Sequence, residues 1–133
     1  MFKTKENVGS IMQQYFLNKK LYEDVYTEII EAGPTLSQSK YTDIVFANYR
    51  WDEKAVIDGI KFDNCVFSKL GLRKSRFSHL NMAHCIFISC YFREAVFSCC
   101  DFTGAVFIDC NFDEASFINC VFQYASFKEC YIE

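Results

Sequence analysis

A five-residue period governs the chain from residue 57 onward. An α-helix returns to the same face every 3.6 residues and a flat strand every two, so neither can keep a five-residue pattern on one side. The 15 Phe residues of the chain need a regular place to be buried, and most of them fall on this period. The recurring apolar positions are Ile57, Phe62, Phe67, Leu72, Phe77, Met82, Phe87, Phe92, Phe97, Phe102, Phe107, Phe112, Phe117, Phe122, Phe127 and Ile132.

A second and usually smaller residue stands two positions before each of these central residues. Ala and Cys are the most frequent, as in Ala95, Cys100, Ala105 and Cys110. Apolar positions separated by one residue define a short strand. The two residues left in each unit must then turn the chain. Four such units close a square coil, so that residues about 20 positions apart stack at the β spacing of about 4.8 Å.

This pattern resembles the pentapeptide-repeat family, whose unit is loosely Ala-(Asp/Asn)-Leu-x-x. Here Phe takes the central Leu position, and Cys alternates with Ala at the small position. The resemblance covers residues 39–133 and implies the family's fold, an all-β solenoid in the form of a right-handed quadrilateral β-helix. We assign residues 41–133 to it. Tyr41 and Phe46 extend the period upstream, and one extra residue between Trp51 and Ile57 predicts a bulged corner in an irregular first coil.

The first part of the chain has a helical pattern instead. Val8, Ile11, Met12 and Tyr15 follow helical spacing, as do Tyr22, Val25, Tyr26 and Ile29. A break near Asn18 would divide them into two short helices, and Gly33 followed by Pro34 ends the pattern. We expect an N-terminal α-helical cap over residues 1–33 and a linker over residues 34–40. The helix can cover the apolar end of the first coil or lie along one face of the coils.

Eight cysteines raise the question of a metal site or a disulfide. Seven of them occupy the small inward position, where stacked parallel thiols are poorly placed for either. A free Cys is there a small hydrophobic residue. Cys99 is the exception, because it falls at an exposed corner. The chain also lacks a nucleophile–base constellation and a glycine loop for phosphate, and a filled rod offers no cleft. We therefore expect no catalytic residue, cofactor or metal, and no enzyme.

The charge pattern bears on the partners. The net charge of −3 argues against direct nucleic-acid binding, which needs a basic face. Basic residues gather between Lys61 and Arg76, whereas acidic residues prevail from Glu94 onward, which predicts a basic middle and an acidic C-terminal end. The sequence begins without a secretory apolar region and has no stretch that could span a bilayer, so we expect a cytoplasmic protein with no membrane partner.

One outer face of the predicted coils differs from the other three, whose outward residues are mixed or polar. The face centred on Phe67, Phe87 and Phe107 carries an apolar stripe, and Val45 continues it into the irregular coil. A contiguous apolar stripe is typical of an interface, although β-branched residues also simply favour strands. The candidate partner face consists of Val66, Ile86, Ile88, Val106 and Ile108.

The last coil is a second candidate surface. No helical pattern follows the final repeat, so we expect an open end with unpaired strand groups. Two such ends can meet about a two-fold axis, which predicts a possible homodimer. The candidate dimer end consists of Phe122, Phe127, Cys130 and Ile132.

These features favour a non-enzymatic binding or scaffold module that presents flat β-helix faces to a protein partner. The resemblance implies an alternative, since some pentapeptide-repeat proteins mimic DNA and protect a type II topoisomerase, DNA gyrase. Mimicry of DNA requires a continuous acidic face rather than mixed charges.

Overall fold

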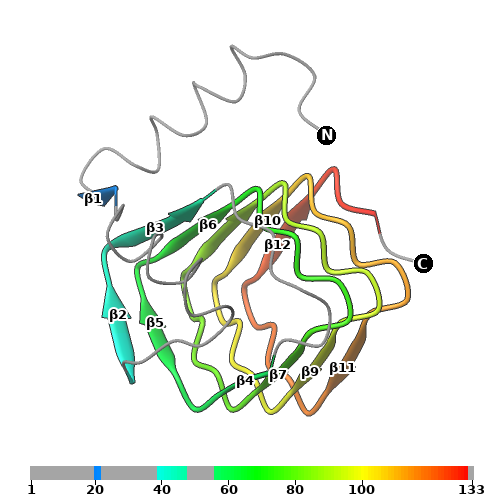
Figure 1. Ribbon diagram of the computed structural model, residues 1–133, viewed down its shortest axis with the longest axis horizontal. Coiled ribbons are helices and arrows are strands. Elements are labelled where there is room, and N and C mark those ends of the chain that lie inside the picture. Colours follow the sequence, from blue (N-terminus) through cyan, green and yellow to red (C-terminus); the bar gives the residue numbers. More distant parts are fainter. Residues whose placement is uncertain (1–19, 22–38, 48–55, 132–133) are drawn as a thin grey trace.

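The computed structural model describes residues 20–21, 39–47 and 56–131 (Figure 1). Within these ranges every regular element is a strand, and no helix there is long and apolar enough to cross a membrane. One sheet consists, in spatial order, of β1 (Lys20–Leu21), β3 (Ile44–Ala47), β6 (Val66–Ser68), β8 (Ile86–Ile88), β10 (Val106–Ile108) and β12 (Ser126–Lys128). The four-stranded sheet consists of β11 (Ser116–Ile118), β9 (Val96–Ser98), β7 (Arg76–Ser78) and β4 (Val56–Asp58), and β2 (Lys40–Thr42) pairs with β5 (Lys61–Asp63).

Successive strands belong to different faces, and each pairs in parallel with the strand one coil later (Figure 1). The six-stranded and four-stranded sheets form two of the four faces. The β2–β5 pair begins a third face, which single parallel bridges continue from Lys61 through Asn81 and Asp101 to Val121. Bridges from Gly71 to Tyr131 form the fourth. The expected right-handed quadrilateral β-helix is thus confirmed.

The register follows directly from the repeat. Phe67 pairs with Phe87, and Phe87 pairs with Phe107, so each coil takes four five-residue units. In the first coil Phe46 pairs with Phe67, so these partners are separated by one residue more than Phe67 and Phe87 are. This difference confirms the extra residue expected in the first coil. Trp51, beside which the bulge was expected, lies outside the described residues. Lys40, the last residue of the linker expected over residues 34–40, belongs to β2, and residues 34–38 lie outside the described residues.

The described corners of the coils use the left-handed backbone region. From Gly59 to Glu129, each residue two positions after a central residue has a φ between 51° and 72°. Six of these 15 corners are closed by a hydrogen bond from the amide of the small residue to the carbonyl of the preceding central residue, as from Ala95 to Phe92 at 3.0 Å. Gly occupies only two of these corners, and no β-branched residue occupies any. The corner position therefore excludes β-branched residues along the described coils, although it holds many different types of side chain.

The core consists of columns of aromatic rings, as the period predicts. The Phe67, Phe87 and Phe107 rings stack nearly parallel at centroid distances of 4.8 and 4.7 Å. Rings of adjacent columns meet edge to face, as Phe97 does with Phe102 at 5.5 Å. Offset stacks and edge-to-face contacts both suit the ring quadrupole and contribute about 0.5–1.5 kcal/mol per pair beyond burial. The inward assignment of the central positions is confirmed, and Phe97 also stacks on Phe117 at 4.9 Å as expected.

The N-terminal α-helical cap expected over residues 1–33 lies almost entirely outside the described residues. Its one described part is β1, where Lys20 pairs with Ile44 and Leu21 with Val45. A strand at this point is incompatible with one continuous helix. It agrees with the alternative of a break near Asn18.

We predict that Phe107→Ala lowers the free energy of unfolding by about 3–5 kcal/mol, because the lost ring leaves a cavity between two stacked neighbours. The Phe107 side chain is 1% exposed, whereas Phe127 in the same column is 40% exposed. Phe127→Ala should cost roughly half as much, since solvent already reaches that ring. Urea unfolding followed by far-UV circular dichroism measures both. Equal costs for the two variants would contradict the assignment of Phe107 to the closed core.

We also predict that Lys69→Val costs about 1–2 kcal/mol, because a β-branched residue is strained in the left-handed region. Lys69 has a φ of 57° and is exposed, so the substitution removes little packing. Lys69→Gly is the matched control and should change stability by less than about 1 kcal/mol, since backbone relief offsets chain entropy. Thermal unfolding separates the two. If Lys69→Val were as stable as the wild type, corner strain would not limit this fold.

Candidate binding surfaces

The structure brings the apolar stripe together, and also buries it. Val66, Ile86, Ile88 and Ile108 form one cluster with Val45, separate from the aromatic core, and Val106 packs against it. These side chains alternate with the inward Phe residues, so they lie on the outer side of the six-stranded sheet. Even so, Val66 and Ile88 are each 0% exposed. At outward positions of the four-stranded sheet, by contrast, Val56 is 65% and Ile118 52% exposed.

The C-terminal coil is the most open part of the described core. Phe112 is fully buried, whereas Phe117, Phe122 and Cys130 are only partly buried and Phe127 is exposed. Phe122, Phe127 and Cys130, three members of the candidate dimer end, are therefore less buried than the equivalent residues of the preceding described coils. Ile132, the remaining member of the candidate dimer end, lies outside the described residues.

Exposed apolar side chains gather on this same coil. Seven large hydrophobic residues are exposed in the part of the chain that the structure describes, and five of them lie between Ile118 and Tyr131. The sequence analysis identified one of the five, Phe127, as a candidate. The others sit at outward or corner positions, and their apolar character at those positions could have revealed them. We define the C-terminal patch as Ile118, Val121, Tyr124, Phe127 and Tyr131.

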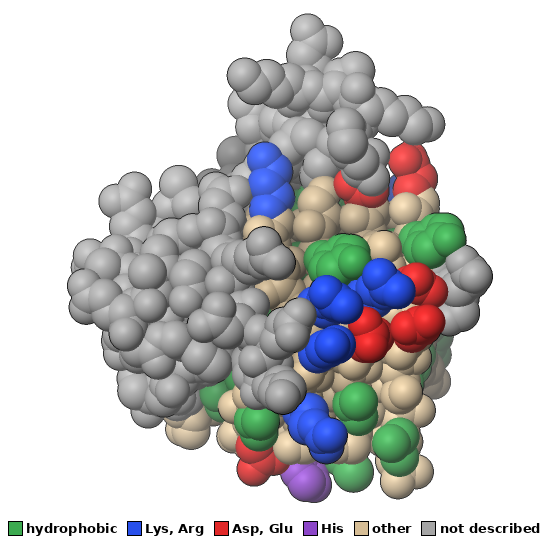
Figure 2. Space-filling model, turned by 45° about the vertical axis from the view of Figure 1, so that its right-hand side comes forward, with side chains coloured by type: hydrophobic (Ala, Val, Ile, Leu, Met, Phe, Trp, Pro, Cys, Tyr) green, Lys and Arg blue, Asp and Glu red, His purple; other side chains and the backbone are tan. Residues whose placement is uncertain are grey.

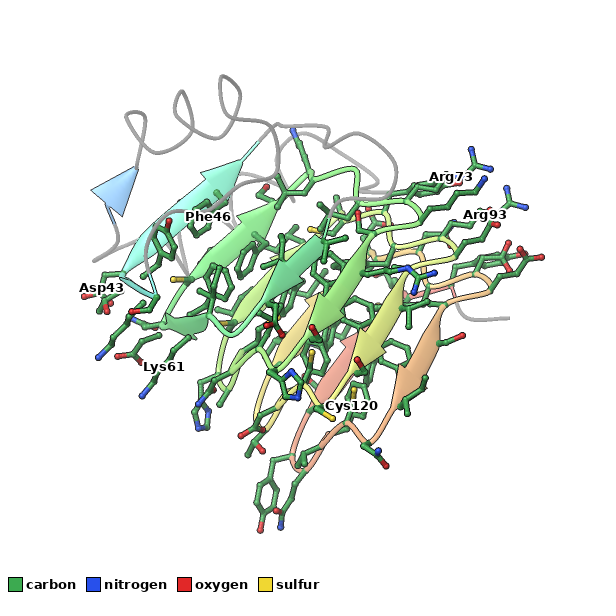
Figure 3. The ribbon with its side chains drawn as sticks, turned by 60° about the horizontal axis from the view of Figure 1, so that its bottom comes forward. Asp43, Phe46, Lys61, Arg73, Arg93 and Cys120 are labelled. Carbon is green, nitrogen blue, oxygen red and sulfur yellow. The ribbon has the colours of Figure 1, made fainter. Side chains whose placement is uncertain are left out.

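The face formed by the bridges from Gly71 to Tyr131 carries mixed charges. Figure 2 shows basic side chains lying directly beside acidic ones, and Figure 3 shows Arg73 and Arg93 projecting outward from successive coils. Arg73 pairs with Glu94 at 3.3 Å, and Arg93 lies between Glu94 at 3.8 Å and Asp113 at 3.7 Å. Such partly exposed pairs contribute at most about 1 kcal/mol each. They also prevent this face from being continuously acidic.

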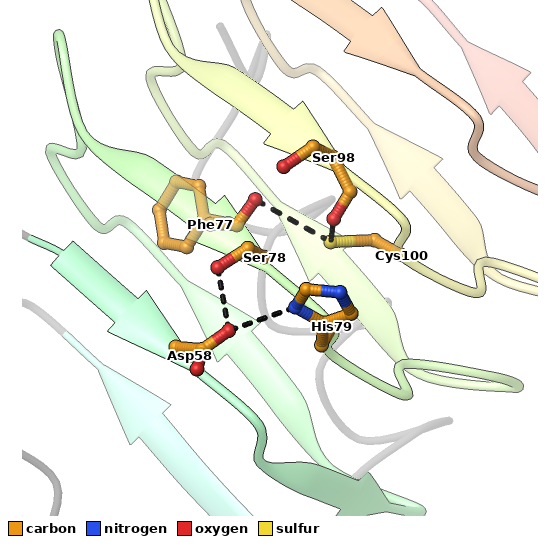
Figure 4. A network of polar contacts seen from close by, with 6 residues as sticks. All are labelled: Asp58, Phe77, Ser78, His79, Ser98 and Cys100. Carbon is orange, nitrogen blue, oxygen red and sulfur yellow. Dashed lines mark hydrogen bonds and ion pairs between the residues drawn. The ribbon is translucent and has the colours of Figure 1, made fainter.

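A serine, a histidine and an aspartate meet at one corner of the four-stranded sheet (Figure 4). The Ser78 hydroxyl donates to Asp58 Oδ1 at 2.6 Å, and His79 Nδ1 lies 3.0 Å from the same oxygen. These two contacts, first that of Ser78 and then that of His79, lower the pKa of the Asp58 carboxyl. A catalytic relay needs the serine hydroxyl to bond to the histidine rather than to the carboxylate. The arrangement is therefore a surface hydrogen-bond network, not an activated nucleophile.

The seven inward thiols form a regular set of contacts between coils. Each Sγ lies 3.1–3.7 Å from the carbonyl oxygen of a central residue in the preceding coil, as Cys110 does from Phe87. Burial raises the pKa of Cys110 and, to about 11, that of Cys100. Such thiols are weak donors held in their protonated form. Among the described residues no group of three or more His, Cys, Asp or Glu side chains is arranged to hold a metal ion.

The exposure of the cysteines follows the coil in which they lie. Cys99 is exposed, as expected at its corner, and Cys65, Cys85, Cys90, Cys100 and Cys110 are buried. Cys120 and Cys130 are only half-buried, because no later coil among the described residues stacks on them. The seven inward thiols therefore differ in exposure, and Cys120 and Cys130 are the more accessible ones.

We predict three classes of thiol reactivity at mildly alkaline pH. Cys99 should be alkylated first, Cys120 and Cys130 next, and the five buried cysteines only after denaturant is added, because burial keeps the reagent from their thiols. For Cys100 and Cys110 a raised pKa also suppresses the thiolate. Iodoacetamide labelling with peptide mass spectrometry resolves the classes. Early labelling of Cys100 or Cys110 in the native protein would contradict the closed core.

Family models match the repeated part of the chain. The description of both models is pentapeptide repeats, one with nine copies over residues 72–116 and one with eight copies over residues 100–133. The matched units are those in which Phe columns, small inward residues and left-handed corners coincide. The chain is a pentapeptide-repeat protein.

Solved structures agree with this fold. QnrB1, a plasmid-mediated fluoroquinolone resistance protein solved in a trypsin-treated form, is similar with a TM-score of 0.54 and 21% identity over 69% of this chain. The pentapeptide-repeat protein Rfr23 of the cyanobacterium Cyanothece 51142 has a TM-score of 0.50 and 9% identity over 74% of this chain. The alignments span 52% of QnrB1 and 63% of Rfr23. At these identities the likeness concerns the fold alone. No curated protein matches in the sequence comparison.

Proposed function

We propose that this protein is a non-catalytic binding module whose partner is a protein that docks on the C-terminal patch. One observation carries the proposal: five of the seven exposed large hydrophobic side chains in the described part of the chain lie on this one coil. Tyr124 is 82% exposed and Tyr131 is 54% exposed. A tyrosine side chain offers an apolar ring and a hydroxyl that can hydrogen-bond, and both suit a protein interface. A solenoid built from identical core units leaves binding to its outer faces and ends.

The geometry of the last coil adds to the apolar surface. β12 and β11 are the terminal strands of the six-stranded and four-stranded sheets, so each presents one edge without a partner strand among the described residues. An open edge can accept a further strand from another chain. Partly covered core rings lie beside these edges, including Phe117 and Phe122. The surface therefore combines backbone hydrogen-bonding groups with apolar side chains.

A second copy of this chain is the first partner to examine. Two ends of this kind are complementary to themselves about a two-fold axis, since each offers the same strand edges and apolar rings. Glu114 and Glu129 are exposed on the same coil and would repel their counterparts in such a dimer. Salt screens that repulsion, so a dimer formed in this way is strengthened by high salt.

We predict that the chain dimerises at high protein and salt concentrations and that Phe127→Lys weakens the dimer at least tenfold, because it places a charge in the centre of the patch. Val56→Lys is the matched control, since Val56 is equally apolar and more exposed but lies on the first strand of the four-stranded sheet. Sedimentation equilibrium measures both affinities. Circular dichroism and the slow reaction of the buried thiols verify that each variant is folded.

A folded Phe127→Lys variant that dimerises like the wild type would contradict the proposed site. A wild-type chain that stays monomeric at high salt would exclude the second copy as the partner. The patch would then be tested by capture from lysate, comparing proteins retained by the wild type and by Val56→Lys but lost with Phe127→Lys. No difference between these three baits would overturn the proposal.

The alternative, a DNA mimic that protects gyrase, has less support. The likeness to QnrB1 concerns the fold, and mimicry requires a continuous acidic face. On the face formed by the bridges from Gly71 to Tyr131, Arg73 and Arg93 lie among carboxylates. The exposed Arg76 and Lys69 lie on neighbouring faces. The charge pattern of the described coils is thus that of a mixed protein surface.

A further inference from the structure

The outer side of the six-stranded sheet is buried within a single chain. Its side chains, including Val66 and Ile88, are as inaccessible as the aromatic core, although they project away from it. Ser68 shares this environment, with its hydroxyl buried and without a hydrogen-bond partner. Burial at these outward positions, together with an unsatisfied hydroxyl, indicates that a largely apolar surface covers this side of the sheet.

The burial has a boundary that shows how far the cover extends. Val45 on β3 and Val66 on β6 are buried. Ile86 on β8 is 9% exposed, and Ile108 on β10 is 8% exposed. On β12 the equivalent positions, Ser126 and Lys128, are exposed. The cover therefore crosses the strands from β3 to β10 and ends before β12. The change from Ile to Lys at this boundary matches the change in environment.

The chain path limits which segment can form the cover. β1 pairs with β3, and β3 pairs with β6, each one coil further along the chain. Residues 22–38 connect β1 to β2, and residues 48–55 connect β3 to β4. Residues 1–19 precede β1, which pairs with β3 at the start of the buried face.

We propose that residues 1–19 dock as an amphipathic segment along the outer side of the six-stranded sheet, from β3 to β10. Val8, Ile11, Met12 and Tyr15 share one side at helical spacing and supply the apolar surface. A helix of this length would span about 28 Å, and three strand spacings amount to about 15 Å, so the segment is long enough. The apolar stripe is thus an intramolecular docking surface, and the free binding surface lies at the C-terminal patch.

Limited trypsin digestion of the full chain tests this docking, because Lys3, Lys5 and Lys19 report on the segment itself. Ile88→Glu places a charge under the cover without adding a cleavage site, and it should raise the cleavage rate at these lysines at least tenfold. Ser98→Glu is the matched control, at the equivalent outward position of the four-stranded sheet. It should leave the rates unchanged. Unchanged rates in a folded Ile88→Glu variant would overturn the proposal.

A second pair of variants covers the case in which Ile88→Glu fails to fold. The double variant Met12→Glu with Tyr15→Glu alters only residues 1–19 and leaves the coils unchanged. It should raise the cleavage rate at the three lysines as Ile88→Glu does. Gln13→Glu with Gln14→Glu is the control on the opposite side of the helical pattern. If both double variants were cleaved like the wild type, residues 1–19 would not be the cover. The measurement is made below the concentration at which the chain dimerises, so its outcome is independent of the C-terminal patch.

Discussion

Stacking between coils is the interaction on which the rest of this structure depends. Each central ring contacts the ring one coil before it and one coil after it, as Phe97 contacts Phe77 and Phe117 at 4.8 and 4.9 Å. The same spacing carries the backbone ladders, for example from the Ile86 amide to the Cys65 carbonyl at 3.1 Å. Burial, aromatic contact and backbone pairing thus share one repeat distance. A change that disturbs the stacking in one column disturbs all three.

A uniform core of this kind leaves little interior variation from which a function can be built. The inward positions hold only apolar residues and small thiols or hydroxyls, and burial raises the pKa of the Cys100 and Cys110 thiols. Differences between one pentapeptide-repeat protein and another must then arise at corners, on outer faces and at the ends of the solenoid. In this chain the outer faces already differ from one another. One is apolar and covered, one has mixed charges, and the last coil exposes aromatic rings.

The sequence predicts the core well because its period equals the structural repeat. The pairing of Phe67 with Phe87, and even the offset that pairs Phe46 with Phe67, can be counted along the chain. Alternation also predicts that Val66 and Ile88 point outward. It cannot predict their burial, because the alternation within a strand does not say what lies over its outer side. The contact between Asp58 and His79 was missed for another reason: it depends on the corner geometry, which no residue type marks.

The burial of the stripe changes how the two candidate surfaces relate to each other. If an apolar face of this size were free, it would compete with the C-terminal patch for partners and would favour aggregation through flat sheet packing. The proposed docking of residues 1–19 would remove that competition and leave most exposed large hydrophobic residues of the described coils on one coil. The proposed docking would also join residues 1–19 to the four coils that contain β3, β6, β8 and β10, a long-range contact that a solenoid with nearest-neighbour contacts otherwise lacks. Such a contact would stabilise the irregular first coils and leave the C-terminal patch as the main exposed apolar surface of the described coils.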